Sequence, residues 1–504
     1  MEDTRICFND NLGTVRWTGS IQGKEGIWVG IEWDDKTKGK HSGSYEGVQY
    51  FVTKVPDSGS FLKEPAFLAG LKPGVSIEYA IFDKYADKNA MDFTETYVPT
   101  VKNFKKPIEL VGTEKIQKRQ EQISNLKEIA LQSCCVASIN EGFGKHLISC
   151  EILLLDKNLI ISWNQVSQIL IEIPQLHTLS LAGNLIEQPL TNPVTHALSI
   201  LALNNMRLNM TSVIPIISQF PQLQELHLFK NSCNDLNVPI ELLSNLKLLN
   251  LEDNNITSWQ SISDQCKHLP YLEKIIINSN PIRQLQYDGG FENLSALSIE
   301  NCDLFDWKSI EEIGKIPGKI KELRMARNLN LTETMRLSLF RFNAVARIGS
   351  LVMLNGSAVR SQERIEAERY YLRSNADNPD AVNAYRWGEL VTKYGPPSEI
   401  SCKVVSEQDS LSGQNLSKNT ITIMIRSLAR VSAGKEFKKK LLLSMNVGDL
   451  KSMCSKLFGV QTNEMKLSFR DKGNIMPEFL DDNLKNIGYY IMSDDGEIWV
   501  EDLS

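Results

Sequence analysis

A short loop near the N-terminus has the residue types that bind carboxylates. Two glycines enclose three polar residues, in the order Gly39, Lys40, His41, Ser42 and Gly43. Glycine lets the backbone approach a ligand closely, and a lysine supplies positive charge for an acidic group. Trp28 and Phe61 flank the loop in sequence. The glycines and the lysine of the loop could accommodate an acidic group such as a carboxylate. Two simpler interpretations, a solvated turn and ordinary core aromatics, stay open at this point.

Short β-strands must position this loop. Residues 1 to about 65 are rich in glycine, aromatic and β-branched residues, and apolar and polar residues alternate in short runs. The pattern predicts strands at residues 13–17, 27–33 and 49–52, each of strand length and bounded by glycine or aspartate. We therefore expect a small, bent β-domain that carries the loop between its second and third predicted strands.

From about residue 150 to 330 the sequence repeats. The template L-x-x-L-x-L-x-x-N-x-L fits eight times, and steps of about 22 to 26 residues separate the asparagine positions. These positions are 158, 184, 206, 231, 254, 280, 302 and 328, with Met206 and Cys302 in place of asparagine. Each copy predicts one strand whose leucines face inward and whose asparagine satisfies backbone groups in the following turn. We expect the positions between them to form a broad protein-binding surface, for example Ser180, Ala202, His227, Asn250, Ile276 and Ser298.

The last 85 or so residues predict a second small domain. Residues 421–426 and 438–443 alternate like strands, and residues 446–458 carry apolar side chains at helical spacing. Strand patterns follow at 466–470 and 497–500. The predicted order is therefore two strands, one helix and two further strands.

Composition excludes several classes of function. The chain has 504 residues and 55 Lys+Arg against 61 Asp+Glu, a net charge of -6, so no nucleic-acid partner is expected. The first residues are acidic and no long apolar run follows, so we expect no membrane span and an intracellular protein. The nine cysteines are scattered, and we expect neither a metal site nor any cofactor. No nucleophile motif or H-E-x-x-H sequence occurs, so we expect no catalytic residues and no enzyme.

The motifs resemble three known domain types. The 39–43 loop, with Trp28 and Phe61, resembles a CAP-Gly domain, whose usual loop reads Gly-Lys-Asn-Asp-Gly; this chain departs at His41 and Ser42. The repeats resemble a leucine-rich-repeat solenoid, and the charged run at 360–373 resembles the helical cap of such arrays. The C-terminal order resembles a ubiquitin-like β-grasp domain, and the terminal sequence lacks the Gly-Gly of a conjugated tag.

The arrangement as a whole is similar to that of the tubulin-folding cofactor E family. It implies a multidomain α+β protein, with a CAP-Gly domain at 1–70, a connector at 71–145, a capped solenoid at 146–374, a linker at 375–418 and a ubiquitin-like domain at 419–504. It also implies that the tail of α-tubulin binds at Trp28, Phe61 and the 39–43 loop.

The resemblance further implies a non-enzymatic chaperone in the cytoplasm and cytoskeleton. Its expected partners are α-tubulin and the other tubulin-folding cofactors (B, C and D), with which it would assemble and dissociate the α/β-tubulin heterodimer. Proteasome or ubiquitin receptors are candidate partners of the C-terminal domain. The alternative function is a microtubule-associated adaptor that links tubulin to the ubiquitin and proteasome machinery.

Overall fold

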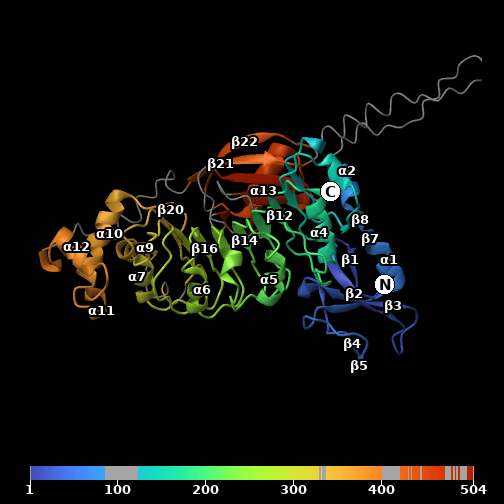
Figure 1. Cartoon of the computed structure of the whole chain (residues 1–504), viewed down its shortest axis with the longest axis horizontal. Helices are drawn as coiled ribbons and strands as arrows, with labels where there is room; N and C mark the ends of the chain where they lie inside the picture. Colours follow the sequence, from blue (N-terminus) through green and yellow to red (C-terminus); the bar gives the residue numbers. More distant parts are fainter. Residues whose placement is uncertain are drawn as a thin grey trace, which may run out of the picture. The chain divides into compact units, whose positions relative to one another are not determined.

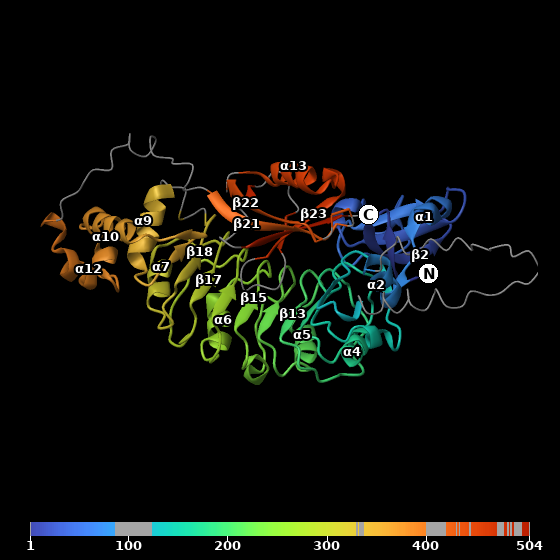
Figure 2. The same cartoon turned by 90° about the horizontal axis from the view of Figure 1, so that it is seen from above.

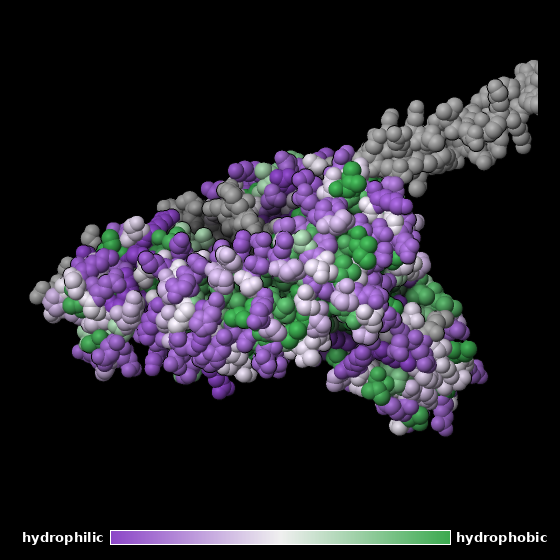
Figure 3. Space-filling model, viewed as in Figure 1, coloured by the Kyte–Doolittle hydropathy of each residue, from purple (hydrophilic) through white to green (hydrophobic). Residues whose placement is uncertain are grey.

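The computed structural model divides into two compact units, residues 1–294 and 295–504. It describes residues 2–85, 123–328, 331, 337–399, 420–429, 431–432, 434–442, 445–470, 478–480, 483, 486–487 and 496–502. Within these residues no helix combines the length and the apolar character that crossing a membrane requires. Hydrophobic residues are scattered among hydrophilic ones on the face drawn in Figure 3.

The first unit begins with an antiparallel five-stranded sheet (Figure 1). Its strands lie in the order β6-β3-β2-β1-β7. They are β1 (Thr4–Phe8), β2 (Asn11–Gly19), β3 (Trp28–Trp33), β6 (Gly59–Lys63) and β7 (Leu71–Lys72). Alternate apolar residues of the central strands pack with Phe67 of α1 (Glu64–Gly70) into one core: Ile6, Val15, Val29, Ile31 and Trp33. The strands predicted at 13–17 and 27–33 are confirmed as parts of β2 and β3.

The strand predicted at 49–52 is only partly formed. A two-stranded hairpin, β4 (Ser44–Tyr45) and β5 (Val48–Gln49), ends before Tyr50. The backbone N–H groups of Tyr50 and Phe51 both donate to the carbonyl oxygen of Gly43, at 3.0 and 3.3 Å. This shared acceptor bends the chain back toward the 39–43 loop, so the prediction of a strand through residue 52 was wrong.

A short segment joins this sheet to the repeats. It contains β8 (Val75–Ser76) and α2 (Ile77–Tyr85), and β8 pairs in parallel with β10 (Val136–Ser138). The hydroxyl of Tyr85 accepts the N–H of Ala130 at 2.7 Å. The part of the predicted connector at 86–122 lies outside the described residues.

Parallel strands and outer helices follow, in the pattern that the repeats predict (Figure 2). The strands are β9 (Glu128–Ala130), β11 (Ile152–Leu154), β12 (Thr178–Ser180), β13 (Ile200–Ala202), β14 (Glu225–His227), β15 (Leu248–Asn250) and β16 (Lys274–Ile276). Across from them lie α4 (Trp163–Glu172), α5 (Met210–Ile217) and α6 (Trp259–Cys266), with short 3-10 turns at Phe143–His146 and Ile240–Leu243. β9 stands before residue 146, within the stretch expected to be a connector, and pairs with β11.

The repeat asparagines are structural, as predicted. Asn254 is fully buried, and its side chain accepts the N–H of Cys233 and donates to the carbonyl oxygens of Leu228 and Glu252, at 2.8 to 3.0 Å. Where the template fails at Met206, the backbone N–H still donates to the next asparagine, Asn231, at 3.0 Å. We call the row of buried repeat asparagines the asparagine ladder. It tolerates the loss of one asparagine because the asparagine of the next repeat also bonds to the backbone of the repeat before it.

Most of the positions on the repeat strands that were expected to be exposed to solvent are buried. Ser180, Ala202, His227 and Ser298 are buried, and Asn250 and Ile276 are half-buried. Short side chains on closely spaced parallel strands leave little room for solvent, and the hydroxyl of Ser180 bonds to Asp156. The expectation that these positions form an exposed binding surface was wrong.

The second unit continues with three parallel strands and a helical cap. The strands are β17 (Ala296–Ser298), β18 (Glu322–Arg324) and β19 (Met353–Leu354), with β20 (Ser357–Ala358) antiparallel to β19. The helices are α7 (Lys308–Gly314), α9 (Leu337–Arg347), α10 (Ser361–Ser374), α11 (Pro379–Val382) and α12 (Trp387–Tyr394), followed by a 3-10 turn at Pro397–Glu399. The charged run thus forms the predicted cap helix α10.

Part of the predicted linker belongs to this cap. Trp387 and Leu390 of α12 pack against Tyr371 and Leu372 of α10. Glu368 of α10 is fully buried and accepts hydrogen bonds from Arg386, Lys393 and Tyr394 at 2.6 to 2.8 Å. The predicted linker therefore contains two helices, at 379–382 and 387–394, that belong to the cap, whereas its residues 400–418 lie outside the described residues.

The C-terminal residues form the predicted two strands, helix and two strands, with one further short strand between the last two. The elements are β21 (Thr420–Ser427), β22 (Glu436–Leu442), α13 (Val447–Phe458), β23 (Met465–Arg470), β24 (Glu478–Phe479) and β25 (Glu497–Asp502), with a 3-10 turn at Thr462–Glu464. The sheet order is β22-β21-β25-β23-β24, with β21 and β25 parallel. Asn446 caps α13 by accepting the N–H of Asp449, and Gly459 ends it in the left-handed conformation. One face of α13 packs on this sheet through Val447, Leu450 and Cys454.

Candidate functional site

The loop at residues 39–43 is held tightly against β6. The N–H groups of Lys40 and His41 donate to the carbonyl oxygen of Gly59, and the N–H of Gly59 donates to the carbonyl oxygen of His41. A Cβ atom on Gly39 would lie 2.1 Å from the carbonyl oxygen of Asp57. Gly43 has a φ of 97°, and a Cβ there would lie 2.0 Å from the carbonyl oxygen of Phe51. The two glycines thus permit a close approach of the chain to itself, while the side chain of Lys40 stays exposed.

His41 and Ser42, the two departures from the usual CAP-Gly loop, complete its internal hydrogen bonds. The Nδ1 atom of His41 accepts the N–H of Gly43 at 3.0 Å. The hydroxyl of Ser42 accepts the N–H of Asp57 at 3.0 Å and lies 3.4 Å from the carboxylate of the same residue. An asparagine and an aspartate also carry acceptor oxygens, so the substituted side chains keep the acceptors that the loop requires.

Five rings gather beside the loop, and we call them the aromatic cluster: Trp17, His41, Tyr50, Phe51 and Phe61. Phe61 is at its centre, with ring centroids 4.8 Å from His41, 5.3 Å from Phe51, 5.6 Å from Tyr50 and 5.9 Å from Trp17. Phe51 is buried, whereas the other four rings are half-buried. The cluster therefore offers solvent an apolar surface made of ring edges and faces.

Trp28, predicted together with Phe61, has different neighbours. Its ring lies under two ammonium groups, 4.8 Å from Nζ of Lys24 and 5.6 Å from Nζ of Lys63. Nζ of Lys24 also lies 3.8 Å from the ring of Tyr45. The structure thus places Phe61 against the loop. Trp28 belongs to a second patch, formed with Lys24, Tyr45 and Lys63, that combines positive charge with aromatic rings.

Sequence reasoning missed Trp17, Tyr50 and Phe51 as members of the cluster. Trp17 ends the predicted strand 13–17, and Tyr50 and Phe51 lie within the predicted strand 49–52. The sequence feature that could have revealed them is the occurrence of three aromatic residues in the short segments on either side of a glycine-rich loop. Only the bend at Gly43 turns Phe51 toward Phe61.

The charge state of the loop follows from its surroundings. Burial, and then the ammonium of Lys40, lower the pKa of His41 below its usual value, although Asp57 opposes this. The bond from the Gly43 N–H requires a bare Nδ1, so His41 is neutral with its proton on Nε2. Near pH 7 the positive charge of the loop therefore comes from Lys40.

The described residues include no group of three or more His, Cys, Asp or Glu side chains placed to hold a metal ion. The loop and the aromatic cluster offer a ligand two kinds of group: the surface of the rings and the charge of the exposed Lys40. That set of groups fits an acidic peptide with an aromatic residue.

The comparisons with known proteins agree with this division into domains. The CAP-Gly domain model matches residues 3–66 and the ubiquitin-like domain model matches residues 420–504. Tubulin-specific chaperone E of Xenopus laevis is 28% identical over 519 residues, which cover 96% of this chain and 95% of that protein. Tubulin-folding cofactor E of Arabidopsis thaliana is 27% identical, with 94% and 92% covered, and the Homo sapiens chaperone is 27% identical, with 96% and 95% covered.

These relatives match the chain from end to end, across the repeats as well as both terminal domains. A solved structure of the C-terminal ubiquitin-like domain of mouse tubulin-specific chaperone e is 21% identical and has a TM-score of 0.16, with 18% of this chain and 93% of that chain covered. Over nearly its whole length this chain is a homologue of tubulin-specific chaperone E, with a CAP-Gly domain at its N-terminus and a ubiquitin-like domain at its C-terminus.

Proposed function

We propose that this protein is a tubulin-folding chaperone whose CAP-Gly domain captures the C-terminal tail of α-tubulin. The observation that carries the proposal is the packing of the 39–43 loop on Phe61 through the ring of His41, at 4.8 Å between ring centroids, with Lys40 exposed next to His41 in the loop. A terminal aromatic residue would pack on the rings. The carboxylates of the tail would meet Lys40 and the lysines over Trp28.

The predicted site residues divide into two roles in this proposal. Lys40, His41 and Phe61 contact the tail end, and Trp28 contacts its acidic stretch together with Lys24 and Lys63. Gly39, Ser42 and Gly43 set the shape of the loop through the close approaches and hydrogen bonds described above.

Binding energy alone drives the chaperone cycle in this proposal. A protein without its own hydrolysis step can change the α/β-tubulin heterodimer only by binding two of its states with different affinity. The tail is one contact and the solenoid supplies a second, so two moderate contacts in one chain reinforce each other.

The cell context follows the same proposal. The protein acts in the cytoplasm and on the cytoskeleton, together with the other tubulin-folding cofactors (B, C and D). Its ubiquitin-like domain docks on proteasome or ubiquitin receptors. Homology along the chain supports the partnership with cofactors, and the folded C-terminal domain with its closed core supports a docking role.

Binding of soluble tubulin tests the proposal. Tubulin with an intact α-tail is compared with tubulin whose terminal tyrosine has been removed, and ATP hydrolysis by the purified protein is measured in parallel. We expect affinity to fall about ten- to hundredfold on removal, since one buried aromatic contributes about 1.5–3 kcal/mol. Equal affinity for both tubulins would refute tail capture, and intrinsic ATPase activity would refute the energetic argument.

The adaptor alternative predicts a different result in a sedimentation assay. A microtubule-associated adaptor would co-sediment with polymerised microtubules at low protein concentration. The chaperone instead sequesters soluble heterodimer and leaves the polymer mass reduced.

A further inference from the structure

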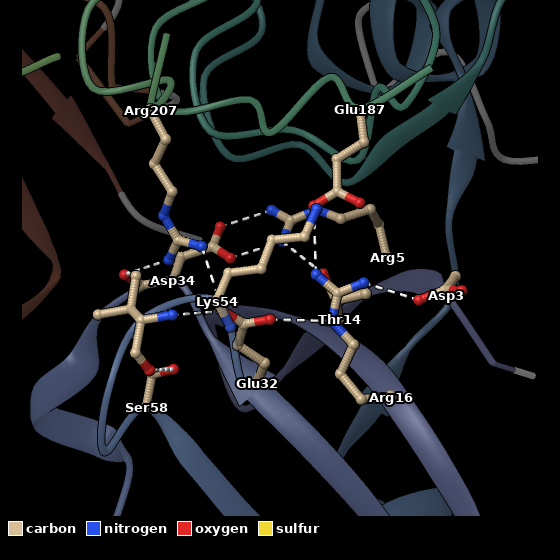
Figure 4. Close-up of polar contacts among 11 residues, drawn as sticks. Asp3, Arg5, Thr14, Arg16, Glu32, Asp34, Lys54, Ser58, Glu187 and Arg207 are labelled. Atoms are coloured by element: carbon tan, nitrogen blue, oxygen red, sulfur yellow. Dashed lines mark hydrogen bonds and ion pairs between the residues drawn. The ribbon is translucent and has the colours of Figure 1, made fainter. Parts of the chain in front are cut away.

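Charged residues of the CAP-Gly sheet contact the solenoid (Figure 4). Glu187 and Arg207 reach from the repeats toward this sheet. Oε1 of Glu187 lies 2.6 Å from Nζ of Lys54 and 3.2 Å from a guanidinium nitrogen of Arg16. Arg207 lies 3.3 Å from Oε1 of Glu32 and 3.4 Å from the carbonyl oxygen of Asp34.

Glu32 is the centre of this contact. Its side chain is 2% exposed, which is rare for a carboxylate unless it is fully paired. It binds Nε of Arg16 at 2.8 Å and accepts the N–H groups of Lys54 and Val55 at 3.0 and 3.3 Å, in addition to Arg207. A buried carboxylate with this many donors fixes the geometry of the groups around it.

A second, apolar contact joins the same two parts of the chain. Cys7 of β1 and Leu12 of β2 pack against Cys135, Ala137 and Leu159 of the first repeats. Cys7 and Cys135 are both buried, at 4% and 8% exposed. Hydrogen bonding between the two side chains lowers the pKa of Cys7 and raises the pKa of Cys135.

The contact with the solenoid and the aromatic cluster use different residues of the same strands. On β2, Arg16 binds Glu187 while its neighbour Trp17 packs on Phe61. Glu187 and Arg207 follow β12 and β13, so they lie where the carboxyl ends of parallel strands form one edge of the solenoid. The CAP-Gly domain therefore docks on that edge through ion pairs of Arg16, Lys54 and Glu32, and not through the rings of the aromatic cluster.

Resting on the function proposed above, we infer that the CAP-Gly domain and the solenoid act as one receptor of fixed geometry. It holds the acidic tail and the body of the same tubulin molecule at once. The docking residues Glu32, Arg16, Lys54, Glu187 and Arg207 are positioning residues for this bivalent grip and do not touch the tail.

Fixed docking matters because of effective concentration. When the first contact forms, a second site held at a matching distance and direction meets its target far more often than one on a free tether. A docked and a freely tethered CAP-Gly domain would then bind the isolated tail equally well, but the docked one would bind the whole tubulin heterodimer much more tightly. Loss of docking should separate these two affinities.

The test reverses the two solenoid charges in the full-length chain, as the double variant Glu187→Lys with Arg207→Glu. The first substitution would place an ammonium group beside Lys54 and Arg16, and the second would place a carboxylate beside the buried Glu32. The matched control reverses Glu273→Lys and Arg283→Glu, two exposed residues of later repeats, and leaves the net charge the same. Adding Lys54→Glu to Glu187→Lys tests rescue, because it restores opposite charges at this pair.

Alkylation by N-ethylmaleimide reports the docking. In the double variant we expect Cys7 and Cys135 to react about tenfold faster than in the wild type, because the apolar contact opens. Cys266 is fully buried in the repeat core, and unchanged protection there shows that the solenoid remains folded. Unchanged reactivity of Cys7 and Cys135 would overturn the docking.

Two affinities report the function. We expect the double variant to bind an α-tubulin tail peptide within about twofold of the wild type, yet to bind whole tubulin about tenfold or more weakly. The control variant should retain both affinities. Equal tubulin affinity in wild type and double variant, with the cysteines exposed, would overturn the single receptor. If the wild-type protein binds no tail peptide, the proposed function is refuted. The alkylation result would still report whether the CAP-Gly domain docks on the solenoid.

Discussion

The Nδ1 atom of His41 lies 3.0 Å from the backbone nitrogen of Gly43 and accepts its hydrogen bond. This contact closes the loop where CAP-Gly domains usually carry an asparagine. It also fixes the tautomer, because an Nδ1 atom that accepts a hydrogen bond cannot hold a proton. The Nε2–H of a ring packed at 4.8 Å on Phe61 is then a donor at the edge of the aromatic cluster. The loop therefore depends on a neutral histidine.

Acid should loosen this loop. Burial and Lys40 lower the pKa of His41, so between its folded value and about 6.5 the unfolded state binds more protons than the folded state. The stability contributed by neutral His41 is complete above about pH 6.5 and is lost as the pH falls through the lowered pKa. Hydrogen-exchange protection factors at residues 41–59 should decrease from pH 7.5 to about 5.5. In His41→Asn, whose side chain accepts the same bond without titrating, this decrease should be absent; an equal decrease in both proteins would contradict the assignment.

Restoring the usual acidic residue of the loop should weaken it here. In Ser42→Asp a carboxylate would replace a hydroxyl that accepts the Asp57 N–H and lies 3.4 Å from the Asp57 carboxylate. Repulsion between two exposed carboxylates costs about 0.5–1 kcal/mol and is screened by salt. We expect lower protection of residues 41–59 at low salt, recovered at about 0.5 M salt.

Two further variants isolate the cause of that effect. Ser42→Asn keeps an acceptor and adds no charge, so it should match the wild type. Ser42→Asp with Asp57→Asn removes the second carboxylate and should restore protection. If the double variant is still destabilised, the shape of the aspartate side chain, and not its charge, causes the loss of protection in Ser42→Asp.

Removal of a repeat asparagine should destabilise the solenoid. In Asn254→Ala the N–H of Cys233 and the carbonyl oxygens of Leu228 and Glu252 lose their partner inside a fully buried site. We expect the free energy of unfolding to fall by about 2–4 kcal/mol. Thermal or urea unfolding followed by circular dichroism measures this. Asn237→Ala, at an exposed position of a neighbouring repeat, is the matched control and should change stability by less than about 0.5 kcal/mol.

The exposed lysine of the loop should matter for binding and not for folding. Lys40→Ala should weaken binding of an α-tubulin tail peptide about two- to fivefold, because one solvent-exposed charge pair contributes at most about 1 kcal/mol. The loss should be greater at about 0.05 M than at about 0.3 M salt, and fluorescence anisotropy with labelled peptide measures both. Lys308→Ala removes an exposed lysine at the start of α7 and should leave the affinity unchanged. A salt-independent loss, or a lower melting temperature, would place Lys40 in the scaffold.

Much of the architecture could be predicted from local sequence. The period of Leu179, Leu226 and Leu249, each fully buried on a strand, is visible without coordinates because every repeat packs against its neighbour in the same way. The helix of the C-terminal domain was likewise predictable, since Val447, Leu450 and Cys454 repeat at helical spacing and all three are buried. Local repetition and local periodicity carry this information directly.

The candidate site was predictable only in part. The residues Gly39 to Gly43 form a contiguous motif, and one stretch of sequence was sufficient to find them. Trp17 and Tyr50 join Phe61 through pairing of strands and the bend at Gly43, which depend on contacts between residues far apart in the chain. For the same reason the sequence did not reveal that Trp28, on the strand next to that of Phe61, lies under Lys24 and Lys63.

The sequence by itself determined the three kinds of domain, the asparagine ladder and the cationic, glycine-bounded loop. These are properties of segments a few residues to a few tens of residues long. Only the tertiary structure decided that Arg207 pairs with Glu32, 175 positions away in the chain, and that Cys7 meets Cys135. Such contacts exist because folding brings one edge of the solenoid against the CAP-Gly sheet. No periodicity or motif in the linear chain encodes that encounter.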